Sequence, residues 1–466
     1  MEIIKNIMNL FNYNSDNYNY NHFNNNHFNN INKKVCDDKK IYNDKKDSHD
    51  KKDSIDHNKI HNNHFNAMCP KFKTIPLIIP HQQRVIAIGD IHGDLRSAIT
   101  LLIVGKLIKE VSCSTFTNLK EIIYIFKNNK LEKITKKISL HEANTIKHNY
   151  YETVYRYYKN NSSYYIKISV FNTIKWYKWI GTDSYVVQVG DQIDRCRPLD
   201  KKCINTELVE DEDSDIEIML LFDSLDMIAR KHNGRVFSLL GNHEMMNVVG
   251  DLRYVSQQGL VNFSDTKSLH RGEINRKKVF RNIISKKMAC TRPTILIIGN
   301  YLFVHAGIIN DLAEKYKLTD INIIIRNYLN NFKGNDEDIE FVINSSSTSP
   351  LWYRGMGFLY PDNYKYDETC KDIFENVIDK INEKNLNVIK ISGMVIGHTP
   401  QFLLNENING ITSACNKKLF RVDIGISKAF NNIVPETDQI KKARTPSVLE
   451  ILTNLETKES TTNILY

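Results

Sequence analysis

The sequence predicts an α/β fold in which mixed β-sheets are covered by helices. Short apolar stretches of the kind found in buried strands alternate with longer helical stretches in the first half of the chain, and further strands cluster in the second half. Of the 466 residues, 41% are hydrophobic and 25% are charged, which is enough apolar material to form a core. Together these observations imply an α/β architecture with one sizeable core.

The individual elements follow from local patterns. Two helices are predicted, Leu95–Ile103 and about 215–232; the second begins with acidic residues and ends at Asn233-Gly234, as expected from the helix dipole and a helix stop. Glycine and a polar residue follow most of the predicted strands. The predicted strands are Val85–Ile88, Tyr185–Val189, Val236–Leu240, Thr294–Ile298, Tyr301–Val304, Met394–Ile396, Leu419–Val422 and Val448–Leu452.

Two segments differ in composition from this pattern. Residues 1–73 are rich in Asn, Tyr, His, Asp and Lys and poor in apolar side chains, so we expect a disordered, solvated tail. A dedicated metal site on its histidines is the less favoured interpretation. Residues 110–172 are rich in Lys, Asn and Tyr and are interpreted as an insertion of mixed structure. One catalytic domain is therefore expected over residues 74–466. The tail histidines are His22, His27, His49, His57, His61 and His64.

Charge and cysteine content limit the function classes. The formal net charge of +9 is too small for a protein that coats nucleic acid, and no run of 18 apolar residues predicts a membrane span. The N-terminus lacks the features of a signal peptide. The eight cysteines form no C-x-x-C pair, so we expect reduced thiols and a cytoplasmic location. The cysteines are at positions 36, 69, 113, 196, 203, 290, 370 and 415.

Residues able to bind metal recur where predicted strands end. Ligand sites of α/β proteins lie at the carboxyl ends of strands, so these loops are expected to converge. Carboxylate, amide and imidazole donors suit Mn, Fe, Zn or Ni, and six donors exceed the needs of one tetrahedral zinc. They fit two metals bridged by one carboxylate. The six residues are Asp90, His92, Asp191, Asn242, His305 and His398.

Each motif alone is weak, but their ordered combination is specific, and it resembles the calcineurin-like metallophosphoesterases, in particular the phosphoprotein phosphatase family. The resemblance covers about residues 84–455. Within that family, the chain is most similar to the Shewanella-like, bacterial-type branch, over Gly241–Val255, Leu351–Arg354 and Asp423–Ser427. The resemblance implies a β-sandwich of two mixed sheets flanked by helices. The five motifs are Gly89–Gly93, Gly190–Arg195, Gly241–Glu244, His305–Gly307 and Gly397–Thr399.

The resemblance also implies roles for individual residues. Asp90, His92 and Asp191 would hold the first of two divalent ions (Mn, Fe or Zn), and Asp191, Asn242, His305 and His398 the second. A water shared by the ions would lose its proton near neutral pH and attack phosphorus in line. His243 would protonate the leaving oxygen, with Asp194 orienting it. Arg195 and Arg354 would bind phosphate oxygens, and Arg253 and Tyr254 would line the pocket.

Two positions depart from the family pattern. Cys196 stands where the family has Gly, and Leu252 stands where the branch has Trp. The first change alters the turn behind Arg195 and brings a thiol near the metals. An inert, packed Cys196 is favoured over a redox switch.

The resulting hypothesis is a binuclear-metal phosphomonoesterase that hydrolyses phospho-Ser/Thr or phospho-Tyr in protein. One alternative is a related metallophosphoesterase that cleaves a dinucleoside polyphosphate, a cyclic nucleotide or nucleic acid. The other is a non-catalytic protein that binds partners through its tail and insertion. Neither a membrane nor a specific nucleic acid is expected as partner, and the sequence does not indicate an oligomeric state.

Overall fold

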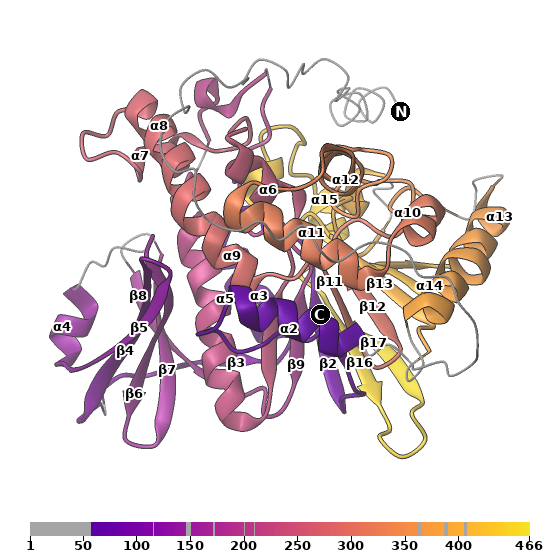
Figure 1. Ribbon diagram of the computed structural model, residues 1–466. Helices are drawn as coiled ribbons and strands as arrows, with labels where there is room; N and C mark the ends of the chain where they lie inside the picture. Colours follow the sequence, from indigo (N-terminus) through magenta and orange to yellow (C-terminus); the bar gives the residue numbers. More distant parts are fainter. Residues whose placement is uncertain are drawn as a thin grey trace, which may run out of the picture. The chain divides into compact units, whose positions relative to one another are not determined.

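The computed structural model describes residues 57–466, apart from 115, 146–150, 171–172, 200, 209, 361–364, 386–389 and 405–407. The expected disorder of residues 1–56, with His22, His27 and His49, therefore lies outside the described residues. Figure 1 shows the arrangement of the helices and strands along the described chain.

One sheet brings together the first three predicted strands. Its order is β10-β9-β2-β16-β17. Strands β2, β9 and β10 are parallel, β16 is antiparallel to β2, and β17 is antiparallel to β16. Ile88, Gln188 and Ser238 are in register, so the loops that follow them leave the sheet at the same edge. The strands are β2 (Arg84–Ile88), β9 (Tyr185–Gln188), β10 (Arg235–Ser238), β16 (Val448–Thr453) and β17 (Ser460–Leu465).

The second sheet is also mixed, in the order β1-β11-β12-β13-β15-β14. Strands β12, β13 and β15 are parallel, and Phe303, Val395 and Phe420 are in register. β11 and β12 form the hairpin predicted around Gly299-Asn300. The strands are β1 (Ile78–Ile79), β11 (Ile295–Ile298), β12 (Tyr301–Val304), β13 (Gly393–Ile396), β14 (Thr412–Ala414) and β15 (Leu419–Arg421).

The hydrophobic core shows how the sheets pack. Alternate residues of the second sheet, such as Leu296 and Phe303, lie in one core cluster with Ile86 and Val187 of the first sheet. Their neighbours, such as Ile297, pack on the other side against helices. This alternation is the period of two of a β-strand with both faces buried. The predicted sandwich of two mixed sheets flanked by helices is confirmed.

Helices cover the outer faces of the sandwich (Figure 1). Both predicted helices are present; the second continues from α5 into a short 3₁₀ turn and stops at Asn233, which has a left-handed φ of 61°. The helices are α2 (His57–Met68), α3 (Leu95–Val104), α4 (Leu140–Thr145), α5 (Asp215–Ala229), α6 (Asn242–Val249), α7 (Gln257–Val261), α8 (Leu269–Val279), α9 (Ser285–Thr291), α10 (Asn310–Lys315), α11 (Leu318–Asn331), α12 (Asp336–Ile339), α13 (Tyr366–Lys371), α14 (Ile378–Asn385) and α15 (Asp438–Ala443). In the described part of the chain, none of them has the length and apolar character needed to cross a bilayer.

The insertion is more regular than expected. It forms a third, six-stranded sheet in which every neighbouring pair is antiparallel, in the order β3-β8-β7-β6-β4-β5. It lies beside helix α5 (Figure 1), to which the backbone N–H of Arg156 donates a hydrogen bond at Ser224 Oγ, 2.8 Å away. The strands are β3 (Ile108–Val111), β4 (Leu119–Lys127), β5 (Lys130–Lys137), β6 (Thr153–Asn160), β7 (Ser163–Val170) and β8 (Thr173–Trp179).

The boundary placed at residue 73 is wrong, because residues 57–68, which were assigned to the tail, form helix α2. This helix packs on α11, where the Arg326 guanidinium lies 5.0 Å from the Phe65 ring centroid. Arg326 also faces His61 Nε2 at 3.1 Å and His64 Nδ1 at 3.3 Å. A few well-placed side chains thus anchor a segment whose polar composition resembles that of a disordered tail.

The docking of α2 makes stability sensitive to acid. Burial, with Arg326 second, lowers the pKa of His61 to about 3. Because this lies below the unfolded value of about 6.5, the stabilisation is complete above that pH and is lost as the pH falls towards 3. We expect His61 to account for a loss of about 2 kcal/mol in the free energy of unfolding by pH 5. Urea titrations at pH 7.5 and 5 should give a smaller pH effect for His61→Gln than for wild type.

Exposed His232 provides the control for this comparison. His232→Gln should keep the wild-type pH dependence of unfolding. An identical pH dependence in His61→Gln and wild type would contradict the assignment to His61.

Three disulfides correct the expectation of free thiols: Cys69–Cys290, Cys196–Cys203 and Cys370–Cys415. The partners of the first and third bonds are separated by 221 and 45 residues and are brought together by the fold, whereas Cys196–Cys203, with a separation of 7, closes a short loop. Cys113 is the one unpaired cysteine among the described residues. The interpretation of Cys196 as an inert, packed thiol is likewise wrong, because Cys196 is bonded to Cys203. Because disulfides persist in oxidising environments, the cysteines no longer support a reduced, cytoplasmic location.

Candidate metal centre

The candidate metal ligands meet at the edge of the sandwich where the parallel strands end. Asp90 and His92 follow β2, Asp191 follows β9, and Asn242 begins α6 after β10. His305 and His398 follow β12 and β13 of the other sheet. All six are at least 97% buried. Residues 308 positions apart are thus brought into contact, as when the N–H of His398 donates to Asp90 Oδ2 at 3.0 Å.

One carboxylate oxygen, Asp191 Oδ2, lies at the centre of the cluster. It is 3.8 Å from His92 Nε2, 3.8 Å from His243 Nε2 and 3.3 Å from His305 Nε2. His305 Nε2 lies in turn 2.9 Å from Asn242 Oδ1 and 3.1 Å from His398 Nδ1. Two groups able to hold a metal, one with His92 and His243 and one with His305 and His398, share Asp191. This is the arrangement expected for a bridging carboxylate.

The second ring nitrogen of each ligand histidine lies near a backbone carbonyl. His92 Nδ1 is 3.3 Å from Ile193 O, His305 Nδ1 is 2.9 Å from Val189 O, and His398 Nε2 is 2.9 Å from Trp352 O. A proton on those nitrogens would leave a lone pair on the nitrogens that face the cluster. Backbone carbonyls commonly orient metal-binding imidazoles in this way.

The backbone that carries these side chains is unusual and is held from several sides. His92, Asp191 and His398 have left-handed φ values of 46°, 54° and 67°, a strain that typically occurs at functional sites. Glu244 accepts hydrogen bonds from the N–H groups of Asp191, Gln192 and Gly241. It therefore ties the loop after β9 to the start of α6.

Two motif glycines are required by close approach of the ligands. A Cβ on Gly241 would lie 2.2 Å from Asp191 Oδ1, and a Cβ on Gly397 would lie 2.3 Å from Asp90 Oδ1. Any larger residue would displace a candidate ligand, so the glycine of each motif serves the ligand of another loop.

The electrostatics of the cluster fit bound cations. Burial, together with Asp423 and Asp191, raises the pKa of Asp90 well above its ordinary value. Asp90 Oδ1 is buried without a hydrogen-bond partner among the described residues. Burial and nearby arginines lower the pKa of His92 and His398, which favours the neutral ligand form. Buried carboxylates with an unsatisfied oxygen are costly unless a cation compensates them, so these residues fit the two metal ions that the sequence implies.

His243 and Asp194 form a pair beside the cluster. His243 Nδ1 lies 2.7 Å from Asp194 Oδ2, which leaves Nε2 directed towards Asp191. Asp194 Oδ1 accepts a hydrogen bond from Asn247 Nδ2 at 2.8 Å, and Arg276 donates to Asn247 Oδ1 at 2.8 Å. The pair thus belongs to a fully buried network that fixes the position of the imidazole.

The two predicted phosphate-binding arginines lie in different surroundings. Arg354 donates to the carbonyl oxygen of His398 at 2.8 Å, at the edge of the metal cluster. Arg195 instead forms ion pairs with Asp94 at 3.1 Å and Glu212 at 3.0 Å. The role of Arg195 in phosphate binding stays a prediction, and its guanidinium already has two carboxylate partners.

Sequence reasoning missed several supporting residues. Glu244 is the last residue of the Gly241–Glu244 motif, so that motif could have pointed to a role for it. Asn247 and Asp423 lie in segments that resemble the Shewanella-like branch but were given no role, and no local signal marks Arg276. Asp423 is fully buried, and burial raises its pKa to about 6. The predicted pocket residue Tyr254 contacts His243, with ring centroids 4.8 Å apart.

The fold and the donor set define the class of protein: an α/β sandwich with a metal site at the carboxyl ends of its strands. Residues 83–402 match the calcineurin-like phosphoesterase family, so the chain belongs to that family. It is therefore a metal-dependent phosphoesterase, and the expected family is confirmed.

Three relatives show how the similarity is distributed. A protein of Acanthamoeba polyphaga mimivirus is 38% identical over 46% of this chain and 89% of its own length. Shewanella-like protein phosphatase 2 of Arabidopsis thaliana is 26% identical over 57% of this chain and 68% of its own. Shewanella-like protein phosphatase 1 of Plasmodium berghei is 29% identical over 56% of this chain and 63% of its own length. The plant and the Plasmodium relative carry the name of the branch that the segments around Gly241 and Asp423 indicated.

Proposed function

We propose that the protein is a two-metal phosphomonoesterase that acts on phosphorylated protein. The observation that carries this proposal is the His243–Asp194 pair, 2.7 Å apart, beside a carboxylate shared by two groups of metal-binding residues. The relatives named as protein phosphatases support a protein substrate. A panel of phosphopeptides distinguishes a preference for phospho-Ser/Thr from one for phospho-Tyr.

The metal-binding residues divide into two sets that share Asp191. Asp90, His92 and Asp191 would hold one ion, and Asp191, Asn242, His305 and His398 would hold the other. Mn, Fe and Zn all suit this mixture of carboxylate, amide and imidazole donors. Bound there, the ions would lower the pKa of water and offset the charge of the phosphoryl group.

The other residues then have separate tasks. Asp194 holds Nδ1 of His243, so Nε2 is the atom from which a proton can pass to the leaving oxygen. Proton donation matters because an alkoxide is a poor leaving group. Arg354 brings a guanidinium to the edge of the cluster, where its planar fork can bind two phosphoryl oxygens.

Replacing His243 with Ala should slow the hydrolysis of a phosphoserine peptide by about 10²-fold or more. The loss should be smaller for p-nitrophenyl phosphate, because nitrophenolate leaves without a proton. The rates of wild type and variant on both substrates, measured with Mn²⁺ present, test this difference.

His232→Ala is the matched control, because that histidine is exposed and belongs to none of the five motifs. It should keep wild-type rates on both substrates. Equal losses on the two substrates in His243→Ala would argue against proton donation. Absence of wild-type activity on any phosphomonoester would argue against the proposed function itself.

A substrate panel separates this proposal from the alternative hydrolases. It should contain phospho-Ser, phospho-Thr and phospho-Tyr peptides, diadenosine tetraphosphate and a phosphodiester. We expect the highest kcat/KM for a phosphopeptide. A higher value for the dinucleotide or the diester would replace the protein substrate while leaving the metal centre as described. Metal analysis of the purified protein identifies the ions.

A further inference from the structure

The loop after β9 carries two arginines, and the structure gives them different environments. Arg195 is paired with Asp94 and Glu212 and also donates to Glu210 O at 3.1 Å. A guanidinium between two carboxylates is already neutralised. Its charge and its fork are therefore engaged in holding the loop rather than available to an incoming anion.

Arg197 is buried as deeply but without such compensation. Only 3% of it is exposed, and it donates to the backbone oxygens of Asp194 at 3.3 Å and Cys196 at 2.9 Å. Among the described residues, no carboxylate lies within ion-pair distance of its guanidinium. A buried cation without an anion is costly, and an anionic ligand beside it would remove that cost.

Aromatic rings place Arg197 next to the metal cluster. Its guanidinium lies 5.4 Å from the ring centroid of Tyr254 and 4.6 Å from that of Phe430. These rings in turn contact His243 at 4.8 Å and His92 at 5.7 Å, measured between ring centroids. Arg195 has no comparable contact with these histidines.

We propose that Arg197 supplies the guanidinium that binds the phosphoryl oxygens of the substrate, on the His92–His243 side of the cluster and together with Arg354. This inference rests on the proposed phosphoesterase function and deepens it. It assigns the task to a residue two positions beyond the arginine that the family pattern marks. Arg195 then acts as a structural residue of the loop.

The Cys196–Cys203 disulfide accounts for the position of Arg197. The N–H of Cys196 donates to Tyr254 O at 3.2 Å, and the N–H of Cys203 donates to Arg253 O at 2.9 Å. The disulfide and these two bonds hold the loop against the segment that carries Tyr254. Cys196, which replaces the family glycine and directly precedes Arg197, therefore helps to fix the position of that arginine.

The test compares two arginine variants by phosphate binding and by turnover. Calorimetric titration of the Mn²⁺-loaded protein with inorganic phosphate should show at least about tenfold weaker binding for Arg197→Gln, in keeping with the strength of charge-assisted bonds. The effect of Arg195→Gln on phosphate affinity should be smaller. Arg197→Lys keeps the charge but not the fork and should lie between wild type and Arg197→Gln. Steady-state rates on p-nitrophenyl phosphate should show the same order in KM.

Two controls make every outcome decisive. Exposed Arg271→Gln should bind phosphate like wild type, and the metal content and melting temperature of each variant show whether it is folded and loaded. Should Arg197→Gln fail to fold, Arg197→Lys and the double variant Cys196→Ser/Cys203→Ser carry the test; both should weaken phosphate binding. Phosphate affinity lowered more by Arg195→Gln than by Arg197→Gln or Arg197→Lys overturns the inference. Because phosphate binding needs no turnover, failure of the proposed function, seen as no wild-type hydrolysis, is distinguished from failure of this assignment.

Discussion

Replacing Asp191 with Asn is expected to lower kcat/KM on phosphomonoesters by at least about 10³-fold. The carboxylate lies within 3.8 Å of His92, His243 and His305, so it is the one side chain shared by both metal groups. Asn would remove the negative charge that the two candidate metal sites share, and a loss of about 4 kcal/mol or more of transition-state stabilisation corresponds to that factor. Steady-state rates and bound metal per protein, measured by mass spectrometry, test the prediction together.

The matched control is Asp265→Asn, which makes the same chemical change at an exposed position. It should leave both metal content and rate unchanged. Asp191→Asn should also lose the rise in melting temperature that Mn²⁺ produces in wild type, since binding to the native state stabilises it. Full metal content and near-wild-type rates in Asp191→Asn would refute the bridging role.

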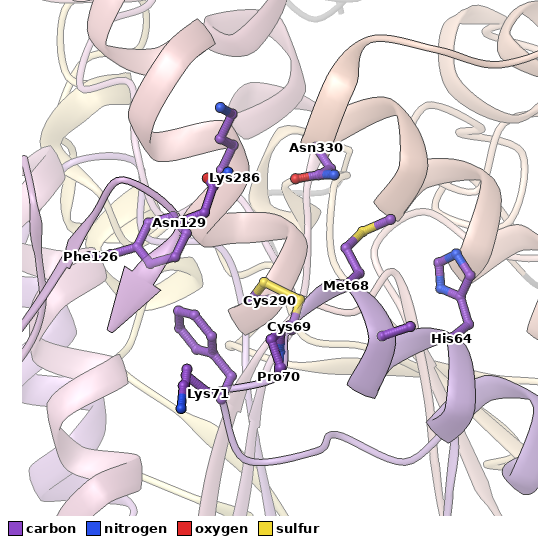
Figure 2. Close-up of a pocket in the computed structure, with 12 residues that line it drawn as sticks. His64, Met68, Cys69, Pro70, Lys71, Phe126, Asn129, Lys286, Cys290 and Asn330 are labelled. Carbon is purple, nitrogen blue, oxygen red and sulfur yellow. A yellow bond between two sulfur atoms is a disulfide. The ribbon is translucent and has the colours of Figure 1, made fainter. Parts of the chain in front are cut away.

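Removal of the Cys69–Cys290 disulfide should lower the free energy of unfolding by about 4 kcal/mol. The bond closes a loop with a sequence separation of 221, which greatly restricts the unfolded chain. It also holds the end of α2 against α9, beside a cavity of about 440 Å³ lined by Lys71, Phe126 and Lys286 (Figure 2). Urea unfolding of Cys69→Ser/Cys290→Ser under non-reducing conditions measures the effect.

Cys113→Ser is the control, because Cys113 is unpaired. Its unfolding midpoint should match that of wild type. The double variant should still hydrolyse p-nitrophenyl phosphate at a temperature where it is folded, because no candidate metal ligand lines the cavity beside the disulfide. A loss below about 1 kcal/mol would mean that the disulfide contributes little beyond the packing of α2.

The meeting of the candidate metal ligands could be predicted because their positions follow from short-range patterns. A buried apolar stretch followed by Gly and a polar residue predicts a strand end, and parallel neighbours place their ends at one edge. Pairing of β2 with β9 and of β12 with β13 then brings Asp90 to Asp191 and His305 to His398. The packing of one sheet on the other then joins the two pairs, as in the hydrogen bond from the N–H of His398 to Asp90 Oδ2.

Other features had no local signal. The polar composition of α2 gave no indication that His61 and His64 would face Arg326, more than 260 residues away. The regular sheet of the insertion was hidden because β5 is exposed at nearly every position and shows no apolar alternation. The motif marked Arg195, but whether a guanidinium faces a phosphate or a carboxylate depends on Asp94 and Glu212, whose approach is decided by folding.

The sequence by itself determined the family, the sandwich of mixed sheets and which candidate metal ligands lie together, because the strand-end motifs lie on neighbouring strands. Only the tertiary structure decided which cysteines pair, that residues 57–68 form a docked helix, and which arginine lies beside the candidate metal cluster. Those outcomes depend on distances between side chains that are remote along the chain, and on which charges burial leaves without a partner. Arg195 and Arg197 are two residues apart in sequence, yet packing gives one of them two carboxylates and leaves the other beside the histidines of the site.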